Sequence, residues 1–165
     1  MTPVGHTLFG LAVGTVCLPR RLTLSRKLGH YFAFALLANI PDLRLPNWGH
    51  NRYDISHSLF VNSLLIIIAI FVSARWTNIR YQLEGSIAWL SHLLLDSFYN
   101  HGLGVAIFWP FSKIRLVLPL PWFSVVKSPP PFTYEVIQEF LVEFVCYSPL
   151  LLIAIAVRKL KTRNK

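Results

Sequence analysis

The chain has 165 residues, of which 54% are hydrophobic and only 14% are charged. A soluble domain usually carries about a quarter charged residues, so this composition argues against an ordinary soluble fold and favours a membrane protein. The formal net charge is +9, but five of the sixteen basic residues lie in the last eight positions, directly after an apolar run. Such a tail is typical of the cytoplasmic flank of a membrane helix, so we expect no nucleic-acid partner.

Apolar residues are grouped in five segments along the chain, at about residues 4–18, 28–41, 57–74, 83–100 and 134–157. A helix needs ~20 apolar residues to cross a bilayer. The last segment meets this length, whereas the first two are short for it. The pattern predicts an all-α, polytopic membrane helix bundle of about five apolar helices. We expect it to form a single domain over residues 1–165, with the lipid bilayer as its partner.

An insert rich in proline and aromatic residues separates the fourth and fifth segments, at residues 101–133. It contains the runs Phe108-Trp109-Pro110-Phe111 and Leu118-Pro119-Leu120-Pro121-Trp122-Phe123. Irregular backbone cannot face lipid hydrocarbon, and tryptophan favours the membrane–water boundary. We therefore expect an irregular loop at the outer membrane face.

The basic residues predict the orientation of the chain. Eleven of them lie in the first and third connections and in the tail, and five lie in the other connections. Cytoplasmic segments carry the excess of lysine and arginine. The sequence therefore predicts a multi-pass protein with a cytoplasmic carboxyl terminus and an external amino terminus.

Five ionisable residues fall at the ends of successive predicted helices. His6 opens the first segment, Asp42 closes the second, His57 opens the third, and His92 and Asp96 lie near the end of the fourth. Because successive spans alternate in direction, all five are expected at the same outer face. Charged and imidazole groups in or beside membrane helices are costly and are usually functional.

This residue set favours a metal site. His92 and Asp96 are one helical turn apart, so both project from one face of a helix. Three histidines and two aspartates suit zinc or a similar divalent ion. Each residue also has a simpler interpretation. His6 suits the membrane interface, Asp42 suits a turn or helix cap, His57 suits the first turn of a capped helix, and His92 with Asp96 suits a buried hydrogen-bonded pair.

Several short motifs resemble the membrane-bound metal-dependent hydrolase family typified by YdjM, a bacterial inner-membrane protein. They occur in the family's order over roughly residues 3–123. The motifs are Gly5-His6-Thr7-Leu8-Phe9-Gly10, Ile40-Pro41-Asp42, Ser56-His57-Ser58-Leu59, His92-Leu93-Leu94-Leu95-Asp96 and Phe108-Trp109-Pro110-Phe111-Ser112.

The order of these residues also resembles, more distantly, the all-α zinc-dependent phospholipase C and P1 nuclease superfamily. That superfamily has a later His-x-x-x-Glu pair, for which Glu135 and Glu139 are only a partial substitute. The chain departs from the YdjM-type pattern at Arg44, where a second acid is common. It departs again at Arg52-Tyr53-Asp54, where His-Arg-Gly is common.

The resemblance implies a metal-dependent hydrolase of the inner membrane that cleaves a phosphoester. The position of the site at the membrane face favours a lipid or lipid-linked substrate. His6, Asp42, His57, His92 and Asp96 would then be both catalytic residues and metal ligands. We expect substrate contacts from Arg44, Arg52, His101, Lys113 and Arg115, since cations neutralise phosphate oxygens.

Two other classes remain open on the sequence. A transporter or ion carrier also places histidine and aspartate in membrane helices, although its site usually lies near the midplane. A non-catalytic membrane protein with a structural metal is compatible with the two departures from the family pattern. A closed coordination shell would favour this last class.

Overall fold

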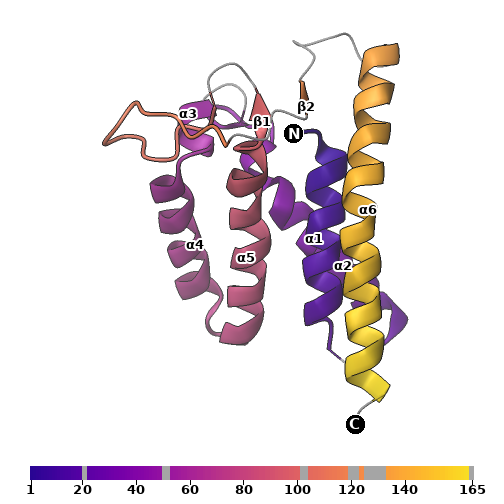
Figure 1. Ribbon diagram of the computed structural model, residues 1–165. Helices are drawn as coiled ribbons and strands as arrows, with labels where there is room; N and C mark the ends of the chain where they lie inside the picture. The colour runs from indigo at the N-terminus through magenta and orange to yellow at the C-terminus, as the bar shows by residue number, and fades with distance from the viewer. Residues whose placement is uncertain (20–21, 50–52, 101–103, 119–122, 125–132, 164–165) are drawn as a thin grey trace.

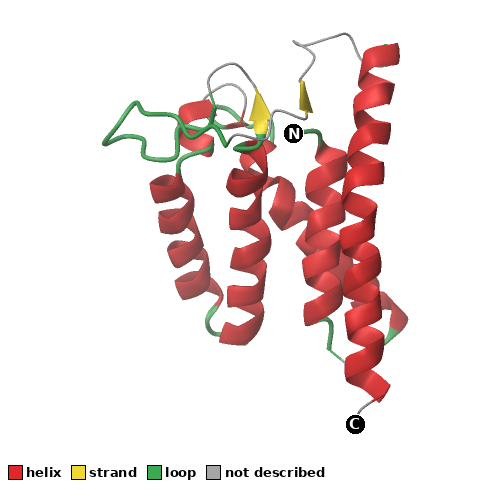
Figure 2. Ribbon diagram, viewed as in Figure 1, coloured by secondary structure: helices red, strands yellow, loops and turns green. Residues whose placement is uncertain are grey.

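A computed structural model of the chain describes residues 1–19, 22–49, 53–100, 104–118, 123–124 and 133–163. Six α-helices make up most of this described part, so the predicted all-α class is confirmed (Figure 2). The helices are α1 Pro3–Cys17, α2 Leu24–Asn39, α3 Tyr53–Ser56, α4 Leu59–Ser73, α5 Ile79–Asp96 and α6 Tyr134–Arg163, with a 3₁₀ turn η1 at Ile40–Asp42. Two short parallel strands, β1 Tyr99–Asn100 and β2 Phe123–Ser124, are also present.

Each predicted apolar segment overlaps one long helix, but the bounds differ: α2 begins earlier than the second segment, α6 ends later than the fifth, and both bounds of the fourth segment were wrong. Helix α5 begins at Ile79, because the side chain of Asn78 caps it by accepting from the backbone amide of Arg80. It ends at Asp96, and the chain then enters strand β1. The prediction missed the first turn of α5 because that turn is polar. It ran on past Asp96 because the following residues are aromatic.

The helices lie roughly side by side, with the two chain ends at opposite ends of the bundle (Figure 1). Helix α1 packs most extensively against α6 and α2, whereas α4 touches α5 lightly. Gly10 allows the close approach of α1 to α2, since a Cβ atom there would lie 2.6 Å from the carbonyl oxygen of Phe34. Small residues serve this purpose in membrane helix pairs.

Helix α6 is, within the described residues, the one helix long and apolar enough to cross a membrane by itself. Its candidate span is Tyr134–Lys161, with 28 residues, and α1 and α4 are shorter apolar helices. Large apolar side chains point outward from α4 and α6, as Phe71 at 77% exposed and Leu152 at 65% exposed illustrate. Contiguous apolar surface of this kind is unusual on a soluble monomer and suits contact with lipid.

Candidate metal centre

The five sequence-predicted ligands lie at helix ends that meet at one end of the bundle. His6 lies in the first turns of α1, which begins after the capping side chain of Thr2. Asp42 is the last residue of η1, directly after α2. His57 lies between α3 and α4, just before Ser58 caps α4. His92 and Asp96 occupy the last two turns of α5.

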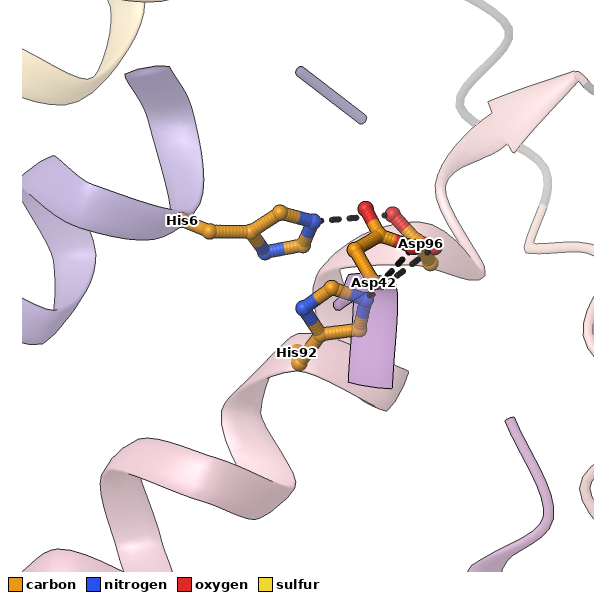
Figure 3. Close-up of side chains that lie close together, drawn as sticks. All are labelled: His6, Asp42, His92 and Asp96. Carbon is orange, nitrogen blue, oxygen red and sulfur yellow. Dashed lines mark ion pairs between the residues drawn. The ribbon is translucent and has the colours of Figure 1, made fainter. Parts of the chain in front are cut away.

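The three imidazoles converge on two carboxylates through their Nε2 atoms. Oδ1 of Asp96 lies 3.2 Å from Nε2 of His6. Its Oδ2 lies 3.1 Å from Nε2 of His57 and 3.5 Å from Nε2 of His92. Oδ1 of Asp42 lies 3.3 Å from His57 and 3.7 Å from His92. Figure 3 shows His6, Asp42, His92 and Asp96 pointing toward one another from α1, η1 and α5. The structure thus brings together all five residues.

Neighbouring groups fix the orientation of two of these rings. His92 Nδ1 lies 2.8 Å from the carbonyl oxygen of Ala38, which can only accept, so Nδ1 is the donor and Nε2 faces the carboxylates. His57 Nδ1 lies 2.8 Å from the Ser56 hydroxyl, which itself reaches the carbonyl of Gly49. Outer partners of this kind hold a histidine in the tautomer and direction that metal binding requires.

The centre is almost completely removed from solvent. The side chains of His6, His57 and His92 are 0% exposed and that of Asp96 is 2% exposed. Burial alone would raise the pKa of Asp42, but its contacts with the His57 and His92 imidazoles outweigh burial, so the pKa of this carboxyl lies below its ordinary range. The carboxylate of Asp42 therefore favours its charged form in this buried site. The α-amino group of Met1 donates to Asp96 Oδ1 at 2.8 Å.

The donor set fits a metal ion. Nitrogen and oxygen ligands bind zinc at about 2.0–2.2 Å, which places neighbouring ligand atoms of a tetrahedral site ~3.4 Å apart. The contacts in this centre run from 3.1 to 3.7 Å. Both ring nitrogens of His6 are buried without a hydrogen bond to any described residue, although Nε2 is close to Asp96. Buried polar atoms of this kind call for a partner.

Four residues form the tightest ligand group. One ligand atom from each of His6, Asp42, His92 and Asp96 lies within 4.8 Å of the other three. His57 borders this group through Asp42 and Asp96. The arrangement therefore offers one candidate metal site from four residues, with His57 at its edge.

The predicted substrate contacts are less clearly placed. Arg44 lies in the loop that follows η1, Lys113 lies in the loop before Arg115, and both side chains are exposed. Arg115 forms an ion pair with Asp54 and donates to the carbonyl of Gly104. Arg52 and His101, which the sequence analysis also proposed, lie outside the described residues.

Tyr53 is a site residue that the sequence analysis missed. Its ring stacks on His57 with centroids 3.7 Å apart, and its hydroxyl lies 3.5 Å from Asp96 Oδ2. Burial raises the pKa of this phenol above its usual value, and the nearby carboxylates of Asp96 and Asp42 raise it further. Tyr53 is therefore a neutral hydrogen-bond donor beside the metal centre. It was overlooked because it occupies a position that departs from the family motif.

Glu143 is a second missed residue. It lies in α6, is 1% exposed, and accepts hydrogen bonds from Thr2 and Gly5 at the start of α1. The sequence analysis instead considered Glu135 and Glu139, of which the first is exposed and the second half-buried. The available signal was the spacing of Glu143, which lies one helical turn after Glu139 and within the last apolar segment.

Fold and site together define a class: an all-α protein with exposed apolar helix surface and a buried histidine–aspartate centre at one end of its helices. The chain belongs to the YdjM inner membrane protein family, which matches residues 1–161. It is also similar to the inner membrane protein YbcI of Escherichia coli (strain K12), with 31% identity over 134 residues. That match covers 73% of this chain and 70% of YbcI. No solved structure matches the chain. The predicted family resemblance and inner-membrane setting are confirmed.

Proposed function

We propose that this protein is a membrane-embedded, metal-dependent hydrolase that cleaves a phosphoester in a lipid or lipid-linked substrate. The observation that carries the proposal is the convergence of three buried imidazole Nε2 atoms on the carboxylates of Asp42 and Asp96. Buried charges are rarely tolerated unless they are paired or bind a metal. Two carboxylates and three imidazoles gathered from four parts of the chain support a catalytic metal centre more strongly than a chance set of polar helix ends.

His6, Asp42, His57, His92 and Asp96 would hold one or two divalent ions, for which zinc fits the mixed imidazole and carboxylate donors best. When bound, such an ion would supply Lewis-acid chemistry, namely a lower pKa for a water molecule and polarisation of the scissile phosphoester. Ala38 and Ser56 hold the His92 and His57 rings in place for this role. Tyr53 stays protonated and can donate to a phosphate oxygen from its position beside Asp96.

An apolar cavity between the helices supports a lipid substrate, and it extends from Trp89 toward Ser73 and Thr77 at the other end of the bundle. It has a volume of about 430 Å³ and lies between α2, α4 and α5, where Phe34, Leu37, Ile66 and Trp89 are among its lining residues. This volume falls within the range of small-molecule sites, about 300–1,000 Å³. Trp89 precedes His92 by three residues on α5, so the cavity and the ligands share one side of that helix. An apolar chain in this cavity would run along α5, and only a head group at its Trp89 end, one helical turn from His92, would lie near the ligands.

The membrane arrangement is part of the proposal. We infer that α1, α2, α4, α5 and α6 all lie in the bilayer and that the metal centre is at the extracytoplasmic face. The basic residues support this orientation, because they lie at helix ends opposite to those that carry the ligands. Arg26 and Lys27 are at the start of α2, Arg75 is between α4 and α5, and Arg158 is in the last turns of α6. Lysine and arginine are concentrated on the cytoplasmic side. The carboxyl terminus is then cytoplasmic.

The proposal is tested by reconstituting the purified protein into phosphatidylglycerol vesicles loaded with a zinc-sensitive dye. Zinc-dependent release of a phosphorylated head group, abolished by a chelator and by His92→Ala, is the expected result. Zinc entry into the vesicles without hydrolysis would support an ion carrier. Stoichiometric zinc with neither hydrolysis nor flux, on this and on other phospholipids and isoprenyl phosphates, would support a structural metal and overturn the hydrolase proposal.

A further inference from the structure

We propose that Glu143 is a positioning residue for His6, acting from α6 on the first turn of α1. One carboxylate oxygen, Oε1, accepts the backbone amide of Thr2 at 2.8 Å. The other, Oε2, accepts the backbone amide of Gly5 at 3.0 Å and the hydroxyl of Thr2. A single side chain therefore holds the residues on either side of the helix start, directly before His6.

The contact has a clear physical basis. The first four backbone N–H groups of a helix lack partners within the helix, and the helix dipole places partial positive charge at that end. A carboxylate satisfies both needs, because it accepts at two oxygens and carries negative charge. The backbone amide and hydroxyl of Thr2 and the backbone amide of Gly5 all donate to Glu143. A glutamine in its place would turn its own N–H group toward at least one of these donors.

The sequence around His6 is adapted to this carboxylate. A Cβ atom at Gly5 would lie 2.6 Å from Cε of Met1 and 2.9 Å from Oε2 of Glu143, so glycine leaves space for both side chains. The amide of Gly5 belongs to the residue that immediately precedes His6. Because the hydrogen bond fixes this backbone, it also fixes the direction in which the His6 ring leaves α1 toward Asp96.

Helix α6 also holds the opposite end of α1, through Arg158. Its guanidinium donates to the carbonyl oxygens of Thr15 at 2.9 Å, Leu18 at 2.7 Å and Pro19 at 3.3 Å. An acid at the start and a base at the end both complement the dipole of α1. Of these two residues, only Glu143 binds the end of α1 that carries His6. Substitution of Arg158 is therefore a matched control, because it weakens the α1–α6 contact at the other end.

This inference rests on the proposed function in one respect, since it takes His6 as a metal ligand. The test is titration of Co²⁺ into the purified full-length protein, with affinity and the visible absorption of bound cobalt as readouts. Glu143→Gln should weaken Co²⁺ binding about 10- to 100-fold, the usual cost of losing a group that orients a ligand. It should also change the cobalt spectrum. Arg158→Gln should leave both the affinity and the spectrum as in the wild type.

A double-variant comparison separates positioning from general damage. If Glu143 acts through His6, then Glu143→Gln should cause little further loss of Co²⁺ affinity in a His6→Ala background. Gly5→Ala keeps the acid but adds a methyl group in contact with its carboxylate, so it should reproduce the change in the cobalt spectrum. This variant replaces Glu143→Gln in the test if Glu143→Gln does not fold.

The possible failures are distinguishable. Wild-type affinity in Glu143→Gln, or fully additive losses with His6→Ala, would overturn the inference while leaving the metal site intact. Wild-type protein that binds no Co²⁺ would instead remove the metal site, and the inference with it. Equal weakening by Glu143→Gln and Arg158→Gln would show that both act only on the packing of α1, and would also overturn it.

Discussion

The imidazole rings of His6 and His92 lie face to face, with centroids 3.6 Å apart and planes inclined by 13°. They come from α1 and α5, and the Nε2 atoms of both are directed at Asp96 (Figure 3). Two imidazolium rings in this contact would repel each other, so at least one ring is neutral, which is the form that binds metals. The stacking therefore brings ligands from two helices together in a state suited to coordination.

Asp96 is the residue on which the three histidines converge, so its charge is open to a direct test. Asp96→Asn keeps the size of the side chain and removes its charge. We expect at least about 100-fold weaker zinc binding, since even the loss of an outer partner costs 10–100-fold. The protein should still insert and fold. Isothermal titration with zinc, with circular dichroism as the folding check, measures both properties.

The matched comparison for Asp96→Asn is Asp54→Asn. Asp54 forms an ion pair with Arg115 at a partly exposed position and does not join the ligand group. Exposed pairs contribute about 0–1 kcal/mol, so zinc affinity should remain close to that of the wild type. Unchanged zinc binding in Asp96→Asn would mean that Asp96 only hydrogen-bonds its neighbours, since asparagine can replace it in that role.

The cavity between α2, α4 and α5 should bind a lipid chain. Ala69 lines this cavity, so Ala69→Trp should fill it. We expect about tenfold less photo-cross-linking of a diazirine-labelled phosphatidic acid to α2, α4 and α5 in vesicles. Ile68→Trp is the control, because Ile68 lies on the same helix and is 49% exposed outside the cavity lining. Equal cross-linking in both variants would rule out occupation of the cavity by a lipid chain.

The proposed orientation makes a separate prediction. Reporter fusions after Lys27, Arg80 and Lys165 should read cytoplasmic, and fusions after Pro46 and Lys127 should read external. The physical reason is the excess of lysine and arginine at the end of the bundle that carries the carboxyl terminus. An external carboxyl terminus would invert the protein in the membrane and place the metal centre at the cytoplasmic face.

The sequence was sufficient to predict the helices and the five candidate ligands. The apolar segments are separated by clear polar or proline-rich breaks, and the residues of the ligand group fall at segment ends. Because successive helices alternate in direction, those ends lie at the same end of the bundle. His6 and Asp96 could therefore be grouped from the sequence, and their Nε2 and Oδ1 atoms lie 3.2 Å apart in the structure.

The sequence was less informative about the groups that support the ligands. The hydrogen bond from His92 to the carbonyl of Ala38 depends on how α2 packs against α5. Every residue has a backbone carbonyl, so this acceptor could not be identified from the sequence. Glu143 pairs with Thr2 and Gly5, which lie almost the whole chain away, so only the packing of α6 on α1 reveals its role. Tyr53 likewise gains its place from the fold of α3 over His57.

The metal content of the purified protein tests the central claim most directly. We predict about one or two equivalents of zinc per chain in the wild type, and a large loss in His57→Ala and in His92→Ala. His30→Ala should keep the metal, because His30 bonds to the carbonyl of Gly14 and lies away from the ligand group. A folded wild-type protein that takes up no divalent metal, or equal metal loss in all three variants, would contradict the account.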